Sequence, residues 1–371
     1  MKIGVDIRAL NTDKLTGVGK YIFNYLDNIL QLDKDNQYYF FNSGFKKPAQ
    51  NFSFTTNNFT IKNLNVSNKI LNWRLLTRLG PKLDSVFEDK LDLFWLPNIN
   101  FCQFGSTPLI LTIHDLSFIH DRRFFSPKSR LWHYLTRVGA LIQRADKIVA
   151  VSEHTKGDVI NFFDVDSSKI VVINPGLETV AMDKDKARSL VAKFALPQKY
   201  FIYVGTLEPR KNINSIIAAF DIYHKDYSDT ALVIVGGQGY KSADLLKIIN
   251  KRPYIKYLAY LDSPIKEALY YLSQGLIWPS FYEGFGFPPL EALACGVPVI
   301  ASYRTSLPEV LKNQAIYVDP YNISDIYQAL KQLTIDDKLG ATLKESLPTY
   351  EMPKWPSQAQ EIIALFNSFK K

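Results

Sequence analysis

Two glutamates, Glu283 and Glu291, flank a glycine-containing stretch that combines the groups needed to bind a sugar phosphate. Carboxylates bind hydroxyl groups, whereas glycines let a ligand approach backbone N–H groups, which attract anions. A sugar joined to a phosphate needs both kinds of partner. The alternative interpretation is an acidic first helical turn after a glycine-rich turn, without a ligand. Between the glutamates the candidate contact residues are Gly284, Phe285, Gly286 and Phe287.

The elements that must position this stretch are two strands and a helix. Short apolar runs at Gly275–Pro279 and Pro298–Ser302 predict buried strands of a parallel sheet. A helix is predicted between them, because Pro288 and Pro289 fit its first turn and Gly296 fits its end. The positive end of this helix then faces the ligand.

Two cations, Arg210 and Lys211, follow another predicted strand at Tyr200–Val204 and open a predicted helix. Cations beside helix N–H groups can neutralise a pyrophosphate leaving group. The alternative is an ordinary solvated helix start. We therefore include both residues as candidates for binding an anionic ligand.

His114 is the histidine with a functional position, because it directly follows the predicted strand Leu109–Ile113. Ligands of parallel α/β sheets bind just past the carboxyl ends of strands, so a functional role is favoured over a structural histidine. The remaining histidines are interpreted as structural: His120, His133, His154 and His224.

Gly17 and Gly19 are predicted to form a turn between a first strand at Lys2–Ile7 and an amphipathic helix. Such a turn exposes backbone N–H groups to a phosphate or another substrate. A turn needed only for its shape is the alternative. A dinucleotide fingerprint is not predicted, because Tyr21 and Ile22 occupy the wrong positions for it.

The composition, 47% hydrophobic and 22% charged, is that of a globular protein. Cys102 and Cys295 are too few for a disulfide framework or a zinc site, so a reducing compartment is expected. The start of the sequence does not predict a signal peptide, and no apolar run of about 18 residues predicts a transmembrane helix. A cytoplasmic protein is expected.

The net charge of +8 is concentrated in two basic, aromatic segments of the first half, Lys69–Lys82 and Arg122–Arg144. Such faces can contact anionic lipid headgroups, which would make the protein peripheral on the cytoplasmic face of a membrane, or they can be solvated helix surfaces. Nucleic acid is not an expected partner, because no nucleic-acid-binding signature accompanies the charge.

Alternating strands and helices across 371 residues predict two α/β domains with doubly wound parallel sheets. We expect domains at residues 1–176 and 177–350, followed by a helix at residues 351–371. Asp183 and Asp185 match a metal-binding Asp-x-Asp pattern only formally, because they lie in the predicted linker and not at a strand end. No metal site is predicted.

Six motifs in one order resemble the family 4 retaining glycosyltransferases of the GT-B fold, particularly bacterial enzymes that resemble mannosyltransferases of O-antigen and capsule assembly. The matches run from Met1 to about Leu330. They are TGVGKY at 16–21, TIHD at 112–115, AVSE at 150–153, YVGTLEPRKN at 203–212, VIVGG at 233–237 and EGFGFPPLEALACGVPVIAS at 283–302.

The resemblance implies two Rossmann-like domains facing a cleft, with the acceptor bound by residues 1–176 and the nucleotide sugar by residues 177–350. It also implies that the last helix crosses back to the first domain. Lys211 then contacts the donor phosphates, Glu283 the sugar hydroxyls and Glu291 the ribose. His114 lines the reacting face, and Gly17 and Gly19 belong to a glycine loop over the phosphates. No metal or other cofactor is expected.

Two positions depart from the family pattern. Thr206 stands where many members carry Arg, so Arg210 is expected to supply that charge. Tyr260 replaces a common Gly beside the base pocket, which permits stacking on the nucleobase.

The predicted function is transfer of a hexose to a lipid-linked or oligosaccharide acceptor in surface polysaccharide synthesis, with retention of the anomeric configuration. Mannose from GDP-mannose is the candidate hexose. The alternatives are a nucleotide-sugar epimerase of similar fold and a catalytically silent subunit that binds a nucleotide sugar.

Overall fold

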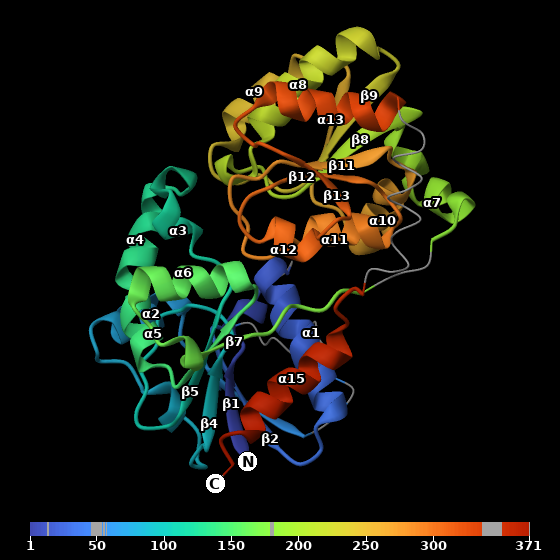
Figure 1. The fold of residues 1–371 in the computed structure, drawn as a ribbon. Coiled ribbons are helices and arrows are strands. Elements are labelled where there is room, and N and C mark those ends of the chain that lie inside the picture. Colours follow the sequence, from blue (N-terminus) through green and yellow to red (C-terminus); the bar gives the residue numbers. More distant parts are fainter. Residues whose placement is uncertain are drawn as a thin grey trace. The chain divides into compact units, whose positions relative to one another are not determined.

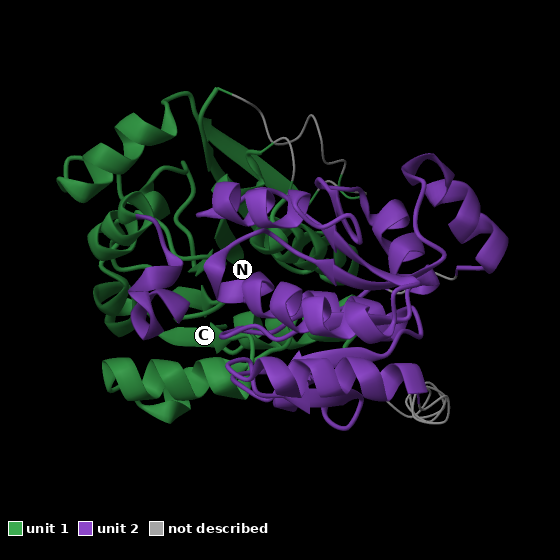
Figure 2. Cartoon of the chain, turned by 90° about the horizontal axis from the view of Figure 1, so that it is seen from above, with its two compact units in different colours: residues 1–116, 127–176, 353–371 green, residues 117–126, 177–352 purple. Residues whose placement is uncertain are grey.

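The computed structural model describes residues 1–12, 15–45, 54, 56, 58–178, 182–335 and 351–370, which form two compact units (Figure 2). The first unit comprises Met1–Leu116, Pro127–Gly176 and Pro353–Lys371, and the second comprises Ser117–Ser126 and Leu177–Met352. The sequence analysis assigned residues 117–126 to the first domain, whereas the structure groups them with the second unit. The predicted end of the second domain at residue 350 lies outside the described residues.

The first unit is built on a seven-stranded parallel sheet with the order β3-β2-β1-β4-β5-β6-β7 (Figure 1). Its strands are β1 (Lys2–Asp6), β2 (Gln37–Ser43), β3 (Phe59–Leu64), β4 (Leu93–Leu96), β5 (Leu109–Ile113), β6 (Lys147–Ala150) and β7 (Ile170–Val172). The central strands β4 and β5 are buried throughout, as expected for a parallel sheet covered on both faces. β1 and β5 lie where strands are predicted at Lys2–Ile7 and Leu109–Ile113. No strand is predicted at β3, which pairs with β2 at the sheet edge.

Helices of the first unit connect and cover these strands. They are α1 (Gly17–Leu32), α2 (Asn68–Leu76), α4 (Pro127–Leu135), α5 (Val138–Arg144), α6 (Glu153–Phe163) and α15 (Trp355–Asn367). The last helix, α15, packs along α1 although the two are far apart in the sequence (Figure 1). The Trp355 ring lies 5.2 Å from the Tyr25 ring, and Phe366 lies 5.6 Å from Trp95. Burial of these aromatic rings holds the chain end on the first unit.

The second unit contains a six-stranded parallel sheet with the order β10-β9-β8-β11-β12-β13. Its strands are β8 (Lys199–Val204), β9 (Thr230–Val235), β10 (Ile255–Leu258), β11 (Gly275–Trp278), β12 (Val299–Ser302) and β13 (Ala315–Val318). Its helices are α3 (Ser117–His120), α7 (Lys184–Val191), α8 (Ile213–Asp226), α9 (Ser242–Asn250), α10 (Ser263–Leu272), α11 (Phe287–Ala294), α12 (Leu307–Leu311) and α13 (Ile323–Ile335).

Both sheets are doubly wound, which confirms the predicted fold class of two Rossmann-like α/β domains. The strand order reverses between β1 and β4 in the first sheet and between β8 and β11 in the second. Ligands of such sheets bind at the carboxyl ends of the strands where the order reverses. In the second unit the loops after β8 and β11 therefore carry the expected site. Within the described part of the chain, no helix has the length and apolar character needed to cross a membrane.

Candidate functional site

Glu283 lies in the loop after β11 and is only 5% exposed. Lys211 Nζ contacts both carboxylate oxygens, at 2.7 Å from Oε1 and 2.9 Å from Oε2. Arg210 Nη1 lies 3.1 Å from Oε2 of the same carboxylate. The residues that the sequence indicated after two different strands thus meet in one ion-paired cluster at the switch point of the second sheet.

Lys211 is buried beside an aromatic surface. Its side chain is inside the fold, with the residue 9% exposed, and Nζ lies 4.7 Å from the centroid of the Trp278 ring. The Trp278 ring stacks on Tyr203 at 5.1 Å. A buried ammonium group needs such compensation, because its loss of hydration is costly. Burial lowers the pKa of Lys211, as does the charge of Arg210, while Glu283 opposes this shift.

The carboxylate of Glu283 is ionised at neutral pH. Burial alone would raise its pKa, but the charges of Lys211 and Arg210 and the hydrogen bond from Lys211 outweigh burial, so the pKa lies below its usual value. Arg210 also donates to Glu208 Oε1 at 2.8 Å and to the carbonyl of Tyr282 at 2.8 Å. The guanidinium therefore links two carboxylates and the backbone of the Glu283 loop.

The backbone of the Glu283 loop is held by the segment after β12. The backbone N–H of Glu283 donates to Thr305 Oγ1 at 3.0 Å, and the Ser306 hydroxyl donates to the carbonyls of Glu283 and Phe285. Gly286 has φ +103°, and a Cβ there would lie 2.7 Å from Leu307 Cδ2. Glycine is therefore required at this position for both its conformation and its space.

The helix after this loop begins at Phe287, with Pro288 and Pro289 in its first turn as predicted. Its N-cap residue is Gly286, which has no side chain, and Gly296 has the positive φ expected after a helix end. Phe285 is buried and its ring lies 5.4 Å from that of Phe287. Gly284 lies between Glu283 and this aromatic pair, so the whole predicted segment forms one loop at the start of α11.

Glu291, on α11, belongs to a separate ion pair. Lys266 Nζ lies 2.5 Å from Glu291 Oε1, and the Tyr270 hydroxyl donates to Oε2 at 3.2 Å. Lys266 and Tyr270 are one helical turn apart on α10, so they face α11 together. The sequence analysis did not identify either residue. Their i,i+4 spacing was visible in the sequence, but the packing of α10 against α11 was not.

His114 directly follows β5 in the first unit, as predicted. Its Nε2–H donates to the carbonyl of Pro97 at 2.8 Å, since a carbonyl can only accept, and the Tyr21 ring contacts it edge-on at 4.6 Å. Burial lowers the pKa of His114. The imidazole is therefore neutral at neutral pH, and its Nδ1 is left as a hydrogen-bond acceptor.

Gly17 and Gly19 differ from the prediction, because they lie in the first turn of α1 and do not form a turn before it. Thr16 caps this helix by accepting the N–H of Gly19 at 3.2 Å. Neither glycine has a positive φ, so no turn conformation required glycine there. A Cβ on Gly17 would meet no atom within 4 Å, so the backbone at the start of α1 is accessible.

The Asp-x-Asp pattern has a structural role in the linker region. Asp183 caps α7, where its side chain accepts the N–H of Lys186 at 2.8 Å.

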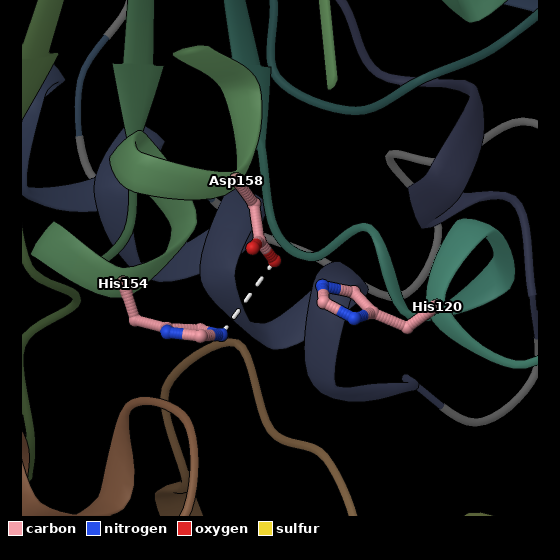
Figure 3. Close-up of side chains that lie close together, drawn as sticks. All are labelled: His120, His154 and Asp158. Atoms are coloured by element: carbon pink, nitrogen blue, oxygen red, sulfur yellow. Dashed lines mark ion pairs between the residues drawn. The ribbon is translucent and has the colours of Figure 1, made fainter. Parts of the chain in front are cut away.

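In the first unit His154 and Asp158 lie one turn apart on α6, with 3.5 Å between Nε2 and Oδ2 (Figure 3). An ion pair at this spacing is a common helix feature and needs no metal to explain it.

The basic segments of the first unit expose large apolar side chains. Trp73 is 59% exposed on α2, and Tyr134 is 80% exposed on α4. Ile70, Leu79 and Leu131 are also exposed on the same two segments. These residues alternate with lysines and arginines, so basic and apolar groups are displayed together. We refer to α2 with the residues after it and to α4 as the basic faces.

Two family models match the chain. The model described as Glycosyltransferase Family 4 matches residues 38–180, and the model described as Glycosyl transferases group 1 matches residues 187–347. The first match covers most of β2 and all of β3 to β7 but not β1, and the second match covers every strand of the second sheet. Both ion-paired glutamates lie within the second match.

Several curated relatives are named as mannosyltransferases. O-antigen chain mannosyltransferase B of Escherichia coli is 31% identical over 235 residues, which are 62% of this chain and 61% of the relative. O-antigen chain mannosyltransferase RfbU of Salmonella typhimurium is 28% identical over 72% of this chain and 75% of its own length. The chain spans about 30% of another similar protein, the serotype-specific mannosyltransferase WbdA of Escherichia coli.

Solved structures share the fold at low sequence identity. The structure of HepE of Anabaena in complex with UDP and glucose has a TM-score of 0.74 at 14% identity, covering 99% of this chain and 100% of the other. WaaG, described as a glycosyltransferase involved in lipopolysaccharide biosynthesis, has a TM-score of 0.70 at 14% identity, covering 98% and 99%. This similarity identifies the same two-domain GT-B fold.

Proposed function

Because the chain belongs to the family 4 glycosyltransferases, with family models matching most of its length, we propose that it transfers mannose from GDP-mannose, with retention of anomeric configuration, to a glycan or lipid-linked acceptor in surface polysaccharide synthesis. The names of two curated relatives, both O-antigen chain mannosyltransferases, support the choice of sugar and of pathway class.

The observation that carries this proposal is the buried Glu283 carboxylate, held by Lys211 and Arg210 at the switch point of the second sheet. A sugar phosphate bound there has hydroxyls for the carboxylate and phosphate oxygens for the two cations. The start of α11 adds a positive dipole end for the phosphates. The cations are already in position, so little reorganisation is needed as charge develops on the leaving group.

In the proposed reaction the bond between the anomeric carbon and the donor phosphate oxygen breaks. A bond from the same carbon to the acceptor oxygen forms on the same face, and the acceptor proton moves to the departing phosphate. Lys211 and Arg210 stabilise the negative charge of the released nucleotide diphosphate. Glu283 positions the sugar hydroxyls and stabilises positive charge near the anomeric carbon; its ion pairs with two cations make it a poor nucleophile.

Glu291 is proposed to bind the two ribose hydroxyls of the nucleotide. Lys266 and Tyr270 hold this carboxylate from α10, which fixes its side chain before the donor binds. Tyr260, which follows β10, is 39% exposed and is proposed to stack on the nucleobase. The donor therefore contacts side chains that follow β8, β10 and β11 of the same sheet.

His114 is proposed to accept a hydrogen bond from a substrate hydroxyl at Nδ1, because its Nε2–H is occupied by Pro97. Gly17 is proposed to offer its backbone N–H to a donor phosphate from the start of α1. Gly19 already donates to Thr16, so its part is to keep the first turn of α1 compact. In this reaction Lys211 and Arg210 neutralise the charge of the leaving nucleotide diphosphate, and no step uses a metal or another cofactor.

The basic faces of the first unit are proposed to contact anionic lipid, which would keep the enzyme peripheral on the cytoplasmic face of a membrane beside a lipid-linked acceptor. Exposed aromatic and aliphatic side chains next to lysine and arginine match the interface between lipid headgroups and acyl chains. This contact requires no helix that crosses the membrane.

A panel of nucleotide sugars tests the proposed donor. Purified protein is mixed with UDP-, GDP- and ADP-sugars while the thermal shift and the release of free nucleotide without acceptor are followed. A shift with GDP-mannose that is lost in Glu291→Ala is expected. Tyr327→Ala, which removes a ring on α13 outside the cluster, is the matched control and keeps the shift.

Other outcomes separate the alternatives. A thermal shift with a different nucleotide sugar would identify that sugar as the donor, and the proposed transferase activity would stand. Conversion of the bound sugar into its epimer without any acceptor would identify an epimerase. Absence of a shift with every donor would contradict the proposed function and favour a silent subunit.

A further inference from the structure

The second unit contains a cavity of about 500 Å³ that none of the proposed donor contacts Lys211, Glu283 and Glu291 lines. We call it the α8 cavity, because the first turn of α8 forms one wall. The other walls come from segments far apart in the sequence. They include Arg123 and Phe124, Glu208, Tyr240, Phe281 and Tyr321. The segment 117–126, which lies in the first half of the chain, therefore completes this cavity.

Aromatic rings form one side of the α8 cavity. The Phe281 ring lies 4.8 Å from Tyr321 on one side and 5.9 Å from Phe124 on the other, nearly parallel to the latter at 6°. Tyr321 is 65% exposed, and Tyr240 adds a fourth ring. A sugar ring has a flat face of C–H groups that packs on aromatic surfaces. The rings therefore offer a platform that a saccharide can cover.

Polar groups of both signs share the same cavity. Asp121 accepts three hydrogen bonds from the Arg123 guanidinium, two from Nε at 3.0 Å and one from Nη2 at 2.7 Å. Glu208 is half-buried and accepts from Arg210. The lining holds two carboxylates, Asp121 and Glu208, and two cations, Arg123 and Lys241, so these side chains give it no net charge to attract a phosphate. Neutral hydroxyl groups, which both donate and accept, suit this mixed lining.

The α8 cavity is connected to the proposed donor site through one side chain. Arg210 bridges Glu208, which lines the cavity, and Glu283, which does not. The backbone N–H of Phe281 also donates to the carbonyl of Arg210 at 2.9 Å. A ligand in the cavity thus lies behind the same loop that carries the two cations of the donor site.

We infer that the α8 cavity binds a saccharide unit of the acceptor glycan, apart from the unit that receives the new sugar. This inference rests on the proposed function, because it assigns a second subsite to the acceptor of that reaction. The cavity then selects glycan chains long enough to reach both the donor site and the aromatic platform. A single sugar would be a poor acceptor compared with an oligosaccharide.

Direct binding of an oligosaccharide tests this inference independently of turnover. Mannotriose is titrated into the full chain and detected by saturation-transfer NMR, with isomaltotriose as a second probe. Tyr321→Ala and Tyr240→Ala are each expected to weaken binding about two- to tenfold, which is the usual contribution of an aromatic contact. Tyr327→Ala is the matched control and keeps the wild-type affinity. Circular dichroism of each variant checks that the fold is retained.

The outcomes distinguish the inference from the proposed function. Equal saccharide binding by wild type, Tyr321→Ala and Tyr240→Ala would overturn the inference, as would no binding of either saccharide. Both results leave the donor thermal shift unaffected. In contrast, a lost donor shift with intact, tyrosine-dependent saccharide binding would contradict the proposed donor and support the cavity. In turnover, the two variants are expected to raise the acceptor KM while donor hydrolysis is unchanged.

Discussion

The carboxyl ends of the two sheets carry different chemistry. In the second unit a carboxylate and two cations are buried together at the strands β8 and β11. In the first unit the corresponding edge, after β5, carries a neutral imidazole bound to a backbone carbonyl. A buried charge must be paired, whereas a neutral ring needs only one hydrogen bond. The first sheet also pairs a buried carboxylate at the end of β1, Asp6, with the single cation Arg8. The two edges therefore differ in that the second joins one carboxylate to two cations, whereas the first adds a neutral imidazole.

The largest effect is expected from removing the charge of Glu283. Glu283→Gln should lower kcat about 10²- to 10³-fold, because a preorganised electrostatic contact is lost. It should also destabilise the fold by about 3–5 kcal/mol, since Lys211 becomes a buried unpaired cation. Chemical denaturation and donor hydrolysis measure the two effects.

The double variant Glu283→Gln with Lys211→Met separates these effects. Stability should largely return, because neither charge remains unpaired, whereas activity should not. Recovery of activity in the double variant would show that the ion pair serves only the fold. An unchanged kcat in Glu283→Gln alone would remove the assigned role of Glu283.

A smaller effect is expected in the first unit. His114→Gln should lower kcat/KM about tenfold, the usual scale for one neutral hydrogen bond to a substrate. The donor thermal shift should change little. A loss of catalytic rate as large as that of Glu283→Gln would mean that both sheets contribute equally to charge stabilisation. It would contradict the difference between the two sheets.

His114 also predicts a pH dependence of stability. Burial lowers its pKa in the folded state, so the unfolded chain binds more protons as the pH falls from about 6.5 through the lowered pKa. The free energy of unfolding should decrease across this window. His114→Gln removes this contribution. The Tm of the wild type should therefore fall relative to the Tm of the variant as the pH is lowered. A difference that is constant with pH would contradict the assignment.

Lys266 should give a donor-binding effect. Lys266→Met leaves the Tyr270 hydroxyl as the side-chain partner of Glu291 among the described residues, so we expect the donor KM to rise about threefold to tenfold, with kcat nearly unchanged. Lys247→Met on the neighbouring helix α9, where the lysine is exposed, is the control. Equal KM values for the two variants would show that Lys266 does not hold Glu291.

The smallest effect is expected from the basic faces. Replacing Trp73 by Ser should reduce co-sedimentation with vesicles containing phosphatidylglycerol, while hydrolysis of the donor in solution remains at the wild-type level. Neutral phosphatidylcholine vesicles are the control. Equal binding to both vesicle types would contradict an electrostatic contact with lipid.

Much of the fold was predictable because parallel strands are marked by short apolar runs between glycine and proline. β5 has the predicted bounds, Leu109–Ile113. No strand is predicted at β3, because its sequence FTIKNL lacks the run of neighbouring apolar residues that marks the buried strands. Gly17 and Gly19 were assigned to a turn, although a Thr16 cap started the helix there.

The sequence by itself determined the loop from Glu283 to Gly286, the start of α11 at its prolines, and the candidate cations, because backbone conformation and capping depend on near neighbours. Only the tertiary structure decided which charges meet. Lys211 and Glu283 are 72 residues apart, and Lys266 reaches Glu291 across two packed helices. Such pairs form when the strand order brings two loops together and burial makes an unpaired charge costly. The spacing of neighbouring residues in the sequence predicts neither condition.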